Sequence, residues 1–462
     1  MADNSDFNPS AGDILSAVVT NHSGSKKEDM AGRIVGFEVR QSMHQMGYSG
    51  SITVLDTVGF LDGFPLRSEE TIELKIRTFD TNTEKNIKVR VYKIDNFIVS
   101  ESGNGAYYTI QFVSDVSFQA STRRIIKSYQ SSISDIAKKV FETYFSKLGG
   151  ADYLDPTKRN RVNEYGTARY AISAEPSRNF FVQPTENINK CIIPNMAPTD
   201  AMKYLQTQAY QSETPSNSFK FFETLDNFYF ATDEYFIKTA QTQDLIDLFY
   251  SPSSNADGRN PDDQINRVEE LNIISRGIDT ANDMMSGAYT NRVTEIDLVR
   301  RKIVNNLFDY SKDAKYIDMS GNRVNLDDNP HTAQFREDTF TEENAKDFLV
   351  YKDYQQAGDI PGSLHTDRHV SKIVSNRLSY QQHLNATKVQ CQIKGRLDIM
   401  PGMIVNLDVQ NMDGINTLSR HTNLSGRYLV VTTLHSRSKE SNTLNTALEL
   451  SKFDWSKGEV DA

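Results

Sequence analysis

Cysteine and long apolar runs are both scarce in this sequence. The chain has 462 residues and two cysteines, Cys191 and Cys391, which lie far apart in apolar, strand-like segments. They cannot form the closely spaced pair of a zinc or redox site, so we expect two buried free thiols in a reducing compartment. No apolar run approaches the ~20 residues that cross a bilayer, so we expect no membrane span. The first residues, MADNSDFNPSAGD, are polar and acidic, unlike a signal peptide.

The motifs of common enzymes are also missing. The chain has no phosphate-binding G-x-x-x-x-G-K-[ST] loop and no G-x-S-x-G elbow, since the segment 47–50 lacks the spacing. His365 and His369 have the spacing of two metal ligands on a helix, but Thr366 stands where a zinc peptidase needs glutamate. The pair 327–328 lacks the ordered spacing of a calcium loop. We therefore predict no catalytic, cofactor-binding or metal-binding residues and no enzyme activity.

The balance of charge is acidic. The formal net charge is -10, with 38% hydrophobic and 24% charged residues. Such a chain repels nucleic acid, because affinity for DNA rests on neutralising phosphates. The short basic clusters at 123–124 and 300–302 are expected to be solvated faces. An acidic protein can still surround DNA that passes through without binding, and a chain of this length predicts two to four domains.

Alternating apolar residues are the main feature that is present. Between 393 and 453, three runs with a period of two follow one another, separated by polar turns and opened by Pro401–Gly402. This pattern predicts antiparallel strands with one face against a core. A similar series between 31 and 125 predicts a first small barrel. Residues 1–30 are rich in Ser, Asp and Asn, so we expect a flexible N-terminal arm.

The middle of the chain changes character. Ser132 begins a capping box before apolar residues at helical spacing, and Pro198 opens a second helical pattern. The segment 219–231, FKFFETLDNFYFA, predicts a hairpin about Asp226–Asn227. Its aromatic residues are expected to pack in a core, with a subunit contact as the alternative.

These patterns divide the chain into segments. We predict a barrel over 31–125, an α/β insert domain over 126–255, and a second barrel from 256–300 together with 381–455. The remaining segments are a polar insertion and helix over 301–380 and a tail over 456–462. Two barrels of similar size indicate an internal duplication, although their residues do not match.

Three groups of residues resemble one family. The strongest is the helix-plus-hairpin pattern, made of Pro198, Asp200, Leu205, Phe219, Phe221, Phe222, Glu223, Thr224, Phe228 and Phe230. A weaker one lies in the C-terminal runs, at Gly395, Leu397, Pro401, Gly402, Gly426, Tyr428 and His435. Another weaker one lies in the first barrel, at Gly50, Ile52, Asp56, Glu70 and Ile72. In this order they resemble the central baseplate hub proteins of contractile-tailed phages, and the hub region of type VI secretion valine-glycine-repeat spikes. The resemblance spans most of 33–455. It implies a mainly β fold with two tube-type antiparallel β-barrel domains and helix-containing insert domains.

The resemblance also implies a function. Hub proteins are structural: a homotrimeric ring of pseudo-sixfold symmetry joins the hexameric tail tube to the trimeric central spike and encloses the channel for DNA. The implied partners are further copies of the chain, the tail spike, the tail tube or tube-initiator protein, and tape measure and wedge proteins. The implied location is the virion, after synthesis in the bacterial cytoplasm. This sequence lacks the oligonucleotide-binding barrel and valine-glycine repeats of spike-fused relatives, so we expect the spike to be a separate chain.

Two other functions remain as alternatives. One is a tail-associated cell-wall hydrolase, and the other is a receptor-binding protein of the tail tip. For the hub, the residues expected to matter are interface and fold positions: the strands 71–77 and 426–436 and the hairpin 219–231.

Overall fold

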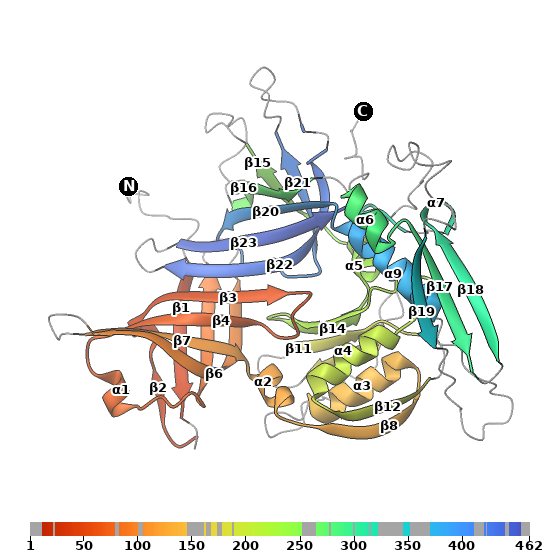
Figure 1. Ribbon diagram of the computed structural model, residues 1–462. Helices are drawn as coiled ribbons and strands as arrows, with labels where there is room; N and C mark the ends of the chain where they lie inside the picture. The colour runs from red at the N-terminus through yellow and green to blue at the C-terminus, as the bar shows by residue number, and fades with distance from the viewer. Residues whose placement is uncertain are drawn as a thin grey trace.

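The chain folds mainly as β-structure with helix-containing inserts, as predicted (Figure 1). A computed structural model describes residues 12–21, 24–78, 83–99, 105–145, 161–162, 168–172, 178–186, 189–251, 265–276, 279–298, 301–313, 316–321, 345–351, 370–410, 420–421, 423–438 and 443–453. Within these ranges no helix is long and apolar enough to cross a membrane. Both cysteines are buried and free, which confirms the prediction for them.

The first barrel is a curved antiparallel sheet in the order β3-β4-β7-β6-β5-β1-β2. Alternation places Ile72, Leu74 and Ile76 in the core while Glu73 faces solvent. Its elements are β1 (Gly12–Thr20), β2 (Lys27–Asp29), η1 (Ala31–Arg33), β3 (Ile34–Ser42), β4 (Ser49–Asp56), α1 (Phe60–Gly63), β5 (Thr71–Thr78), β6 (Glu84–Val99) and β7 (Ala106–Ser114).

Strand β1 corrects the expected N-terminal arm. Residues 12–20 pair with β5, and Ala17 and Val19 are fully buried. The register of β1 shifts between Ile14 and Ser16. This bulge interrupts the alternation of apolar and polar residues by which the other strands are predicted, so the sequence pattern does not predict a strand here.

The second barrel runs in the order β16-β20-β23-β22-β21-β15. A bridge between Phe249 and Arg267 brings its two outer strands together. Its strands are β15 (Ile246–Tyr250), β16 (Val268–Ser275), β20 (Thr387–Lys394), β21 (Ile404–Val409), β22 (Gly426–Ser438) and β23 (Thr443–Lys452). Two boundaries differ from the prediction. Strand β15 belongs to this barrel rather than to the insert, and residues 290–297 do not belong to this barrel.

Both barrels follow one topological plan. If the six strands of each barrel are numbered along the chain, with β2 left out, the sheet order is 2-3-6-5-4-1 in both. One pairing differs, because β1 is antiparallel to β5 whereas β15 is parallel to β21. An internal duplication accounts for this agreement in strand order.

The insert between the barrels packs two helices against a hairpin and strands. Ser132 caps α3 through Asp135 N, and Pro198 opens α4, as predicted. Its core holds the buried, closely packed rings of Phe141, Phe180 and Phe221. The elements are α2 (Asp115–Ser121), β8 (Ile125–Ser131), α3 (Ile133–Tyr144), β9 (Arg161–Val162), β10 (Ala168–Ile172), β11 (Arg178–Val182), β12 (Asn189–Met196), α4 (Pro198–Gln208), β13 (Lys220–Glu223), β14 (Asn227–Ala231) and α5 (Asp233–Ala240).

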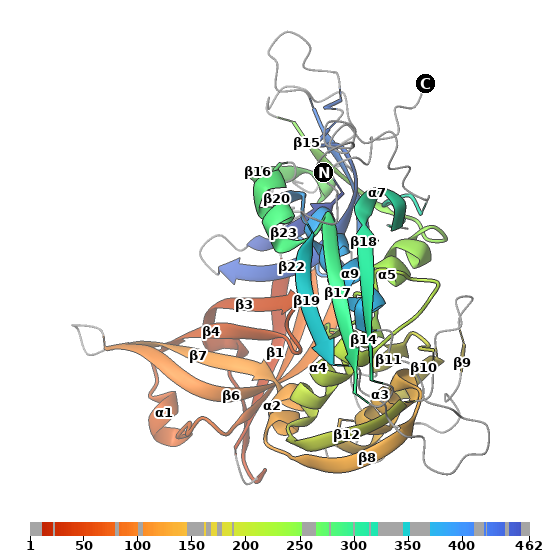
Figure 2. The same cartoon turned by 45° about the vertical axis from the view of Figure 1, so that its right-hand side comes forward.

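A second insert interrupts the second barrel between β16 and β20. It contains a separate sheet in the order β18-β17-β19, which α9 contacts (Figure 2). The expected polar insertion therefore contains two strands, β18 and β19. They pair with β17, so β17 belongs to this separate sheet and not to the second barrel. Its elements are α6 (Thr280–Ser286), β17 (Thr290–Asp297), β18 (Lys302–Asp309), α7 (Tyr310–Asp313), β19 (Lys346–Tyr351) and α9 (Val370–Leu384).

Candidate assembly site at the joint between the barrels

A single strand joins the two barrels. The first part of β22, Gly426–Leu429, pairs with β21 of its own barrel. From Thr432 to Ser438 the same edge of β22 pairs instead with β3 of the first barrel. The partners change at a bulge, where the register against β23 shifts between Val430 and Thr432. The sheet is therefore continuous from one barrel into the other (Figure 1).

Gln41 ties together three parts of the chain at this joint. Its side chain is fully buried on β3. The amide oxygen accepts a hydrogen bond from Leu225 N in the hairpin turn at 2.8 Å. The amide nitrogen donates to Thr433 Oγ1 at 3.2 Å and lies 3.2 Å from His435 Nε2, both on β22. One amide side chain of the first barrel thus satisfies groups from the second barrel and the insert.

His435 is held as a neutral imidazole. Thr446 Oγ1 donates its proton to Arg396 O at 2.6 Å, so it must accept from His435 Nδ1 at 3.0 Å. The other nitrogen, Nε2, is then the acceptor for Gln41. Burial, with a smaller effect of Lys85, lowers the pKa of His435 to about 4. This residue of the C-terminal pattern is therefore a fixed part of the joint, with both ring nitrogens engaged.

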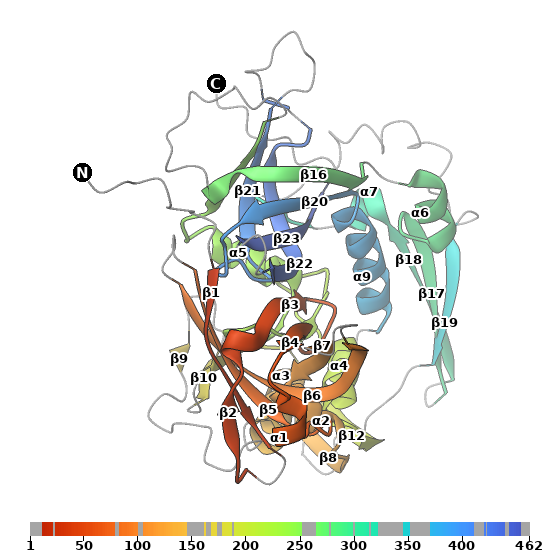
Figure 3. The ribbon, with the colours of Figure 1, turned by 90° about the vertical axis from the view of Figure 1, so that its left-hand side faces the viewer.

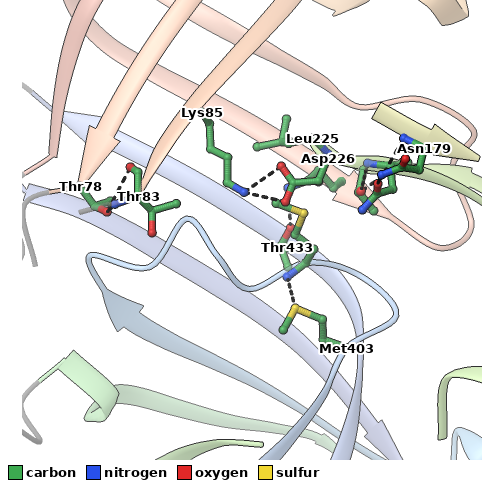
Figure 4. Close-up of polar contacts among 12 residues, drawn as sticks. Thr78, Thr83, Lys85, Asn179, Leu225, Asp226, Met403 and Thr433 are labelled. Carbon is green, nitrogen blue, oxygen red and sulfur yellow. Dashed lines mark hydrogen bonds and ion pairs between the residues drawn. The ribbon is translucent and has the colours of Figure 1, made fainter. Parts of the chain in front are cut away.

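An ion pair connects the hairpin turn of the insert with the first barrel. Lys85 Nζ, at the start of β6, lies 2.8 and 2.6 Å from the two carboxylate oxygens of Asp226 (Figure 4). Lys85 is mostly buried, whereas Asp226 is partly exposed. The predicted hairpin turn therefore docks onto the first barrel.

Glu223 fixes the insert to the first barrel. Its buried carboxylate accepts hydrogen bonds from Ser114 Oγ at 2.6 Å and Ser117 Oγ at 2.8 Å, and it pairs with Arg178. Gly47 leaves room for this contact, because a Cβ there would lie 2.2 Å from Ser117 Oγ. The glutamate of the F-E-T pattern is thus a buried anchor.

The Pro401–Gly402 corner packs against the same insert. Gly402 has a φ of +91°, and a Cβ there would lie 3.1 Å from the ring of Phe236. The corner and α5 border a groove of about 690 Å³. Glycine is needed at this position both for its backbone conformation and for close contact with an aromatic ring.

The residues singled out from the sequence fall inside this arrangement. Strand β5 lies between β1 and β6, and β22 lies between β23 on one edge and β21 and β3 on the other. The edges of both strands are therefore used within the chain. In the hairpin the five phenylalanines are buried, which confirms that they pack in the core. Gln41 was not predicted, because no local pattern marks its contacts.

The described residues contain no cluster of three or more His, Cys, Asp and Glu side chains that could hold a metal ion. His365 and His369, the pair considered as metal ligands, lie outside the described residues, as does the pair 327–328. At the joint, polar groups of the two barrels and the insert are buried and form hydrogen bonds or ion pairs with one another.

Comparison with known proteins gives only distant likenesses. No family model matches the chain, and no curated protein matches it. A tail protein from Neisseria meningitidis is 11% identical with a TM-score of 0.48, covering 95% of this chain and 96% of that chain. A 43 kDa tail protein of a Shewanella oneidensis prophage is 9% identical with a TM-score of 0.49, covering 95% and 98%.

An E. coli component of the type VI secretion system is 9% identical with a TM-score of 0.42, covering 98% of this chain and 79% of that chain. It is described as similar in structure to the tail proteins gp27 and gp5 of bacteriophage T4. These structural neighbours are tail and secretion-system proteins. At TM-scores below 0.5 they do not decide the function of this chain.

Proposed function

We propose that this chain is a structural hub protein of a phage tail baseplate. Three copies form a ring that joins the hexameric tail tube to a trimeric spike and encloses the channel for DNA. The role is mechanical rather than catalytic. The assembled ring is part of the virion.

The observation that carries the proposal is the pair of barrels with one strand order. Each chain has two equivalent barrels joined edge to edge. A ring of three copies would therefore be threefold in its chains and approximately sixfold in its barrels. This is the geometry that a part between a sixfold tube and a threefold spike requires. The sequence resemblance to hub proteins, which spans most of the chain, supports the same reading.

The contacts at the joint support a mechanical role. Gln41 contacts His435 and Leu225 N across subdomain boundaries. Glu223 of the insert accepts a hydrogen bond from Ser114 of the first barrel. Partly satisfied networks would leave the barrels free to rotate, whereas satisfied ones fix them. A fixed angle between barrels is what a closed ring needs.

The proposed partners are other copies of this chain, a tail spike, the tail tube or its initiator, and tape measure and wedge proteins. DNA would pass through the ring without sequence-specific binding. The net charge of -10 is in keeping with such a passage, because an acidic chain does not retain phosphates.

Light scattering of the purified chain across a range of concentrations tests the proposal. The expected mass is three times the 52.3 kDa of one chain. A stable dimer would contradict the threefold ring. A monomer at every concentration, unchanged when a candidate spike or tube protein is added, would also reject the proposal.

A further inference from the structure

The outer half of β6 repeats the register shift of β22, but among the described residues only one of its two edges is paired. Strand β6 pairs with β5 only from Glu84 to Arg90, while it pairs with β7 as far as Val99. The register against β7 shifts between Val91 and Lys93, directly after the pairing with β5 ends, and shifts again between Asp95 and Ile98. In β22 the corresponding shift lies between Val430 and Thr432, directly after β21 ends. Beyond this bulge β22 pairs with β3, whereas no described strand pairs with that edge of β6.

A matching edge is open on β16. In the common strand numbering β16 is the counterpart of β3. Both begin with a register shift, between Ile34 and Gly36 in β3 and between Val268 and Glu270 in β16. Strand β16 has a further shift between Ile273 and Ser275, which β3 lacks. Strand β16 pairs with β20 on one edge (Figure 3). On its other edge the described residues provide only the bridge at Arg267, so Glu270–Ser275 has no strand partner there.

Both open edges carry exposed apolar side chains. On β6 the exposed fractions are 56% for Phe97, 63% for Ile98 and 60% for Val99, and on β16 Ile274 is 52% exposed. The end of the β6–β7 hairpin projects away from the rest of the chain in two views (Figures 1 and 2). A projecting apolar strand with an unpaired edge invites pairing with another chain.

We infer that the outer part of β6, from Lys93 to Val99, pairs antiparallel with β16 of a second copy of this chain. This contact would repeat between chains the β22–β3 joint that exists within the chain. It deepens the proposed hub function and rests on it. Because the two surfaces differ, the contact is head-to-tail rather than twofold, and in the proposed trimer three such contacts close the ring.

The internal joint also gives a register. Arg90 and Leu429 correspond, since each lies opposite the first residue of the fourth strand of its barrel. Ile34 and Val268 correspond at the bulges of the second strand. Leu434 lies opposite Arg40 in the internal joint. The same offsets place Asp95 of one copy opposite Ile274 of the next, where Asp95 directly precedes the second shift of β6 and Ile274 lies at the second shift of β16.

Cysteine cross-linking of the full-length chain tests this register. The variants are Asp95→Cys and Ile274→Cys, purified separately and mixed before oxidation or treatment with a short bis-maleimide. Native Cys191 and Cys391 are buried, so the background is low. The mixture is expected to form covalent dimers, neither variant alone should do so, and the double variant should form covalent closed trimers.

Glu84→Cys is the matched control on the same strand. Glu84 is exposed on β6, but β5 occupies its edge. Mixed with Ile274→Cys, it should give at least tenfold less cross-linked product. Ile98→Asp should raise the dissociation constant of the trimer at least tenfold, whereas Tyr351→Asp should not, although the exposed fractions are 63% and 62%.

The outcomes separate this inference from the hub proposal. A trimeric mass with cross-linking no greater than the control would overturn the strand assignment and leave the hub intact. Dimers formed by a single variant alone would mean a twofold contact and would overturn the head-to-tail pairing. A monomeric mass without any cross-link would overturn both.

Discussion

The side-chain nitrogen of Gln41 lies 3.2 Å from Nε2 of His435, although 394 positions separate the two residues in the sequence. The first belongs to the opening barrel and the second to the closing one. Their contact is buried, and it is continued by Leu225 N on one side and Thr446 Oγ1 on the other. Two barrels and an inserted hairpin are thus held in one orientation by a chain of hydrogen bonds without exposure to water.

Replacing Gln41 should destabilise the whole chain. Gln41→Leu keeps the size of the side chain but leaves Leu225 N, Thr433 Oγ1 and His435 Nε2 without their partner. We expect a loss of at least about 3 kcal/mol in the free energy of unfolding, because three buried groups lose their partner and each costs about 1–3 kcal/mol. Urea unfolding at fixed protein concentration measures it. Gln390→Leu, at an exposed position of β20, is the control and should change stability by less than about 0.5 kcal/mol. Equal effects of the two substitutions would contradict the role given to Gln41.

Acid should weaken the joint through His435. The pKa of this buried imidazole in the folded chain is about 4, below the value of 6.5 for an exposed histidine. The fold therefore favours the neutral form. Its contribution to stability is complete above pH 6.5 and is lost as the pH falls through about 4, at up to about 1.4 kcal/mol per pH unit.

The measurement is urea unfolding at several pH values between 7 and 4, for the native chain and for His435→Gln. A glutamine can donate to Thr446 and accept from Gln41, but it does not titrate. The variant is expected to lose that part of the pH dependence. Identical slopes for the two proteins would show that His435 is not the titrating group.

The sequence predicts elements better than it predicts joints. Strand β5 and helix α3 were predicted because alternation at Ile72, Leu74 and Ile76 and the cap at Ser132 are local signals. Strand β1 was missed because its bulge breaks the alternation. The outer half of β6 was missed because its exposed apolar residues follow no inward-facing pattern.

The joint could not be read from the sequence for a different reason. Gln41 meets Leu225 and His435 only after three subdomains have folded, and a glutamine on a strand carries no local mark of such a contact. Resemblance to a family identified His435 and Glu223 as pattern residues without saying what they touch. Their partners follow from the tertiary structure alone.

Removing the charge of Glu223 should destabilise the attachment of the insert. Glu223→Gln keeps the shape but leaves the buried guanidinium of Arg178 without its anion. Breaking one side of a buried ion pair costs about 3–5 kcal/mol. The double variant Glu223→Gln with Arg178→Met removes the unpaired charge and should be more stable than Glu223→Gln alone by at least about 1 kcal/mol. Urea unfolding of the single and double variants measures both terms. A double variant that is no more stable than the single one would mean that the guanidinium is not the source of the cost.

Glycine at position 50 should be required for the sheet that carries the joint. A Cβ on Gly50 would lie 1.9 Å from the carbonyl oxygen of Glu38 on the neighbouring strand β3, and 2.7 Å from the ring of Phe112. The carbonyl belongs to the backbone of the strand that pairs with β22, so it cannot move aside without disturbing the joint. Gly50→Ala is expected to destabilise the chain by at least about 2 kcal/mol, since forced overpacking costs about 1–3 kcal/mol and backbone displacement adds to it. Gly32→Ala is the control, because a Cβ there meets no atom within 4 Å and the backbone φ is not in the left-handed region. Thermal unfolding of both variants at equal protein concentration measures the difference, and a melting temperature for Gly50→Ala equal to that of Gly32→Ala would contradict the close approach of β3 and β4.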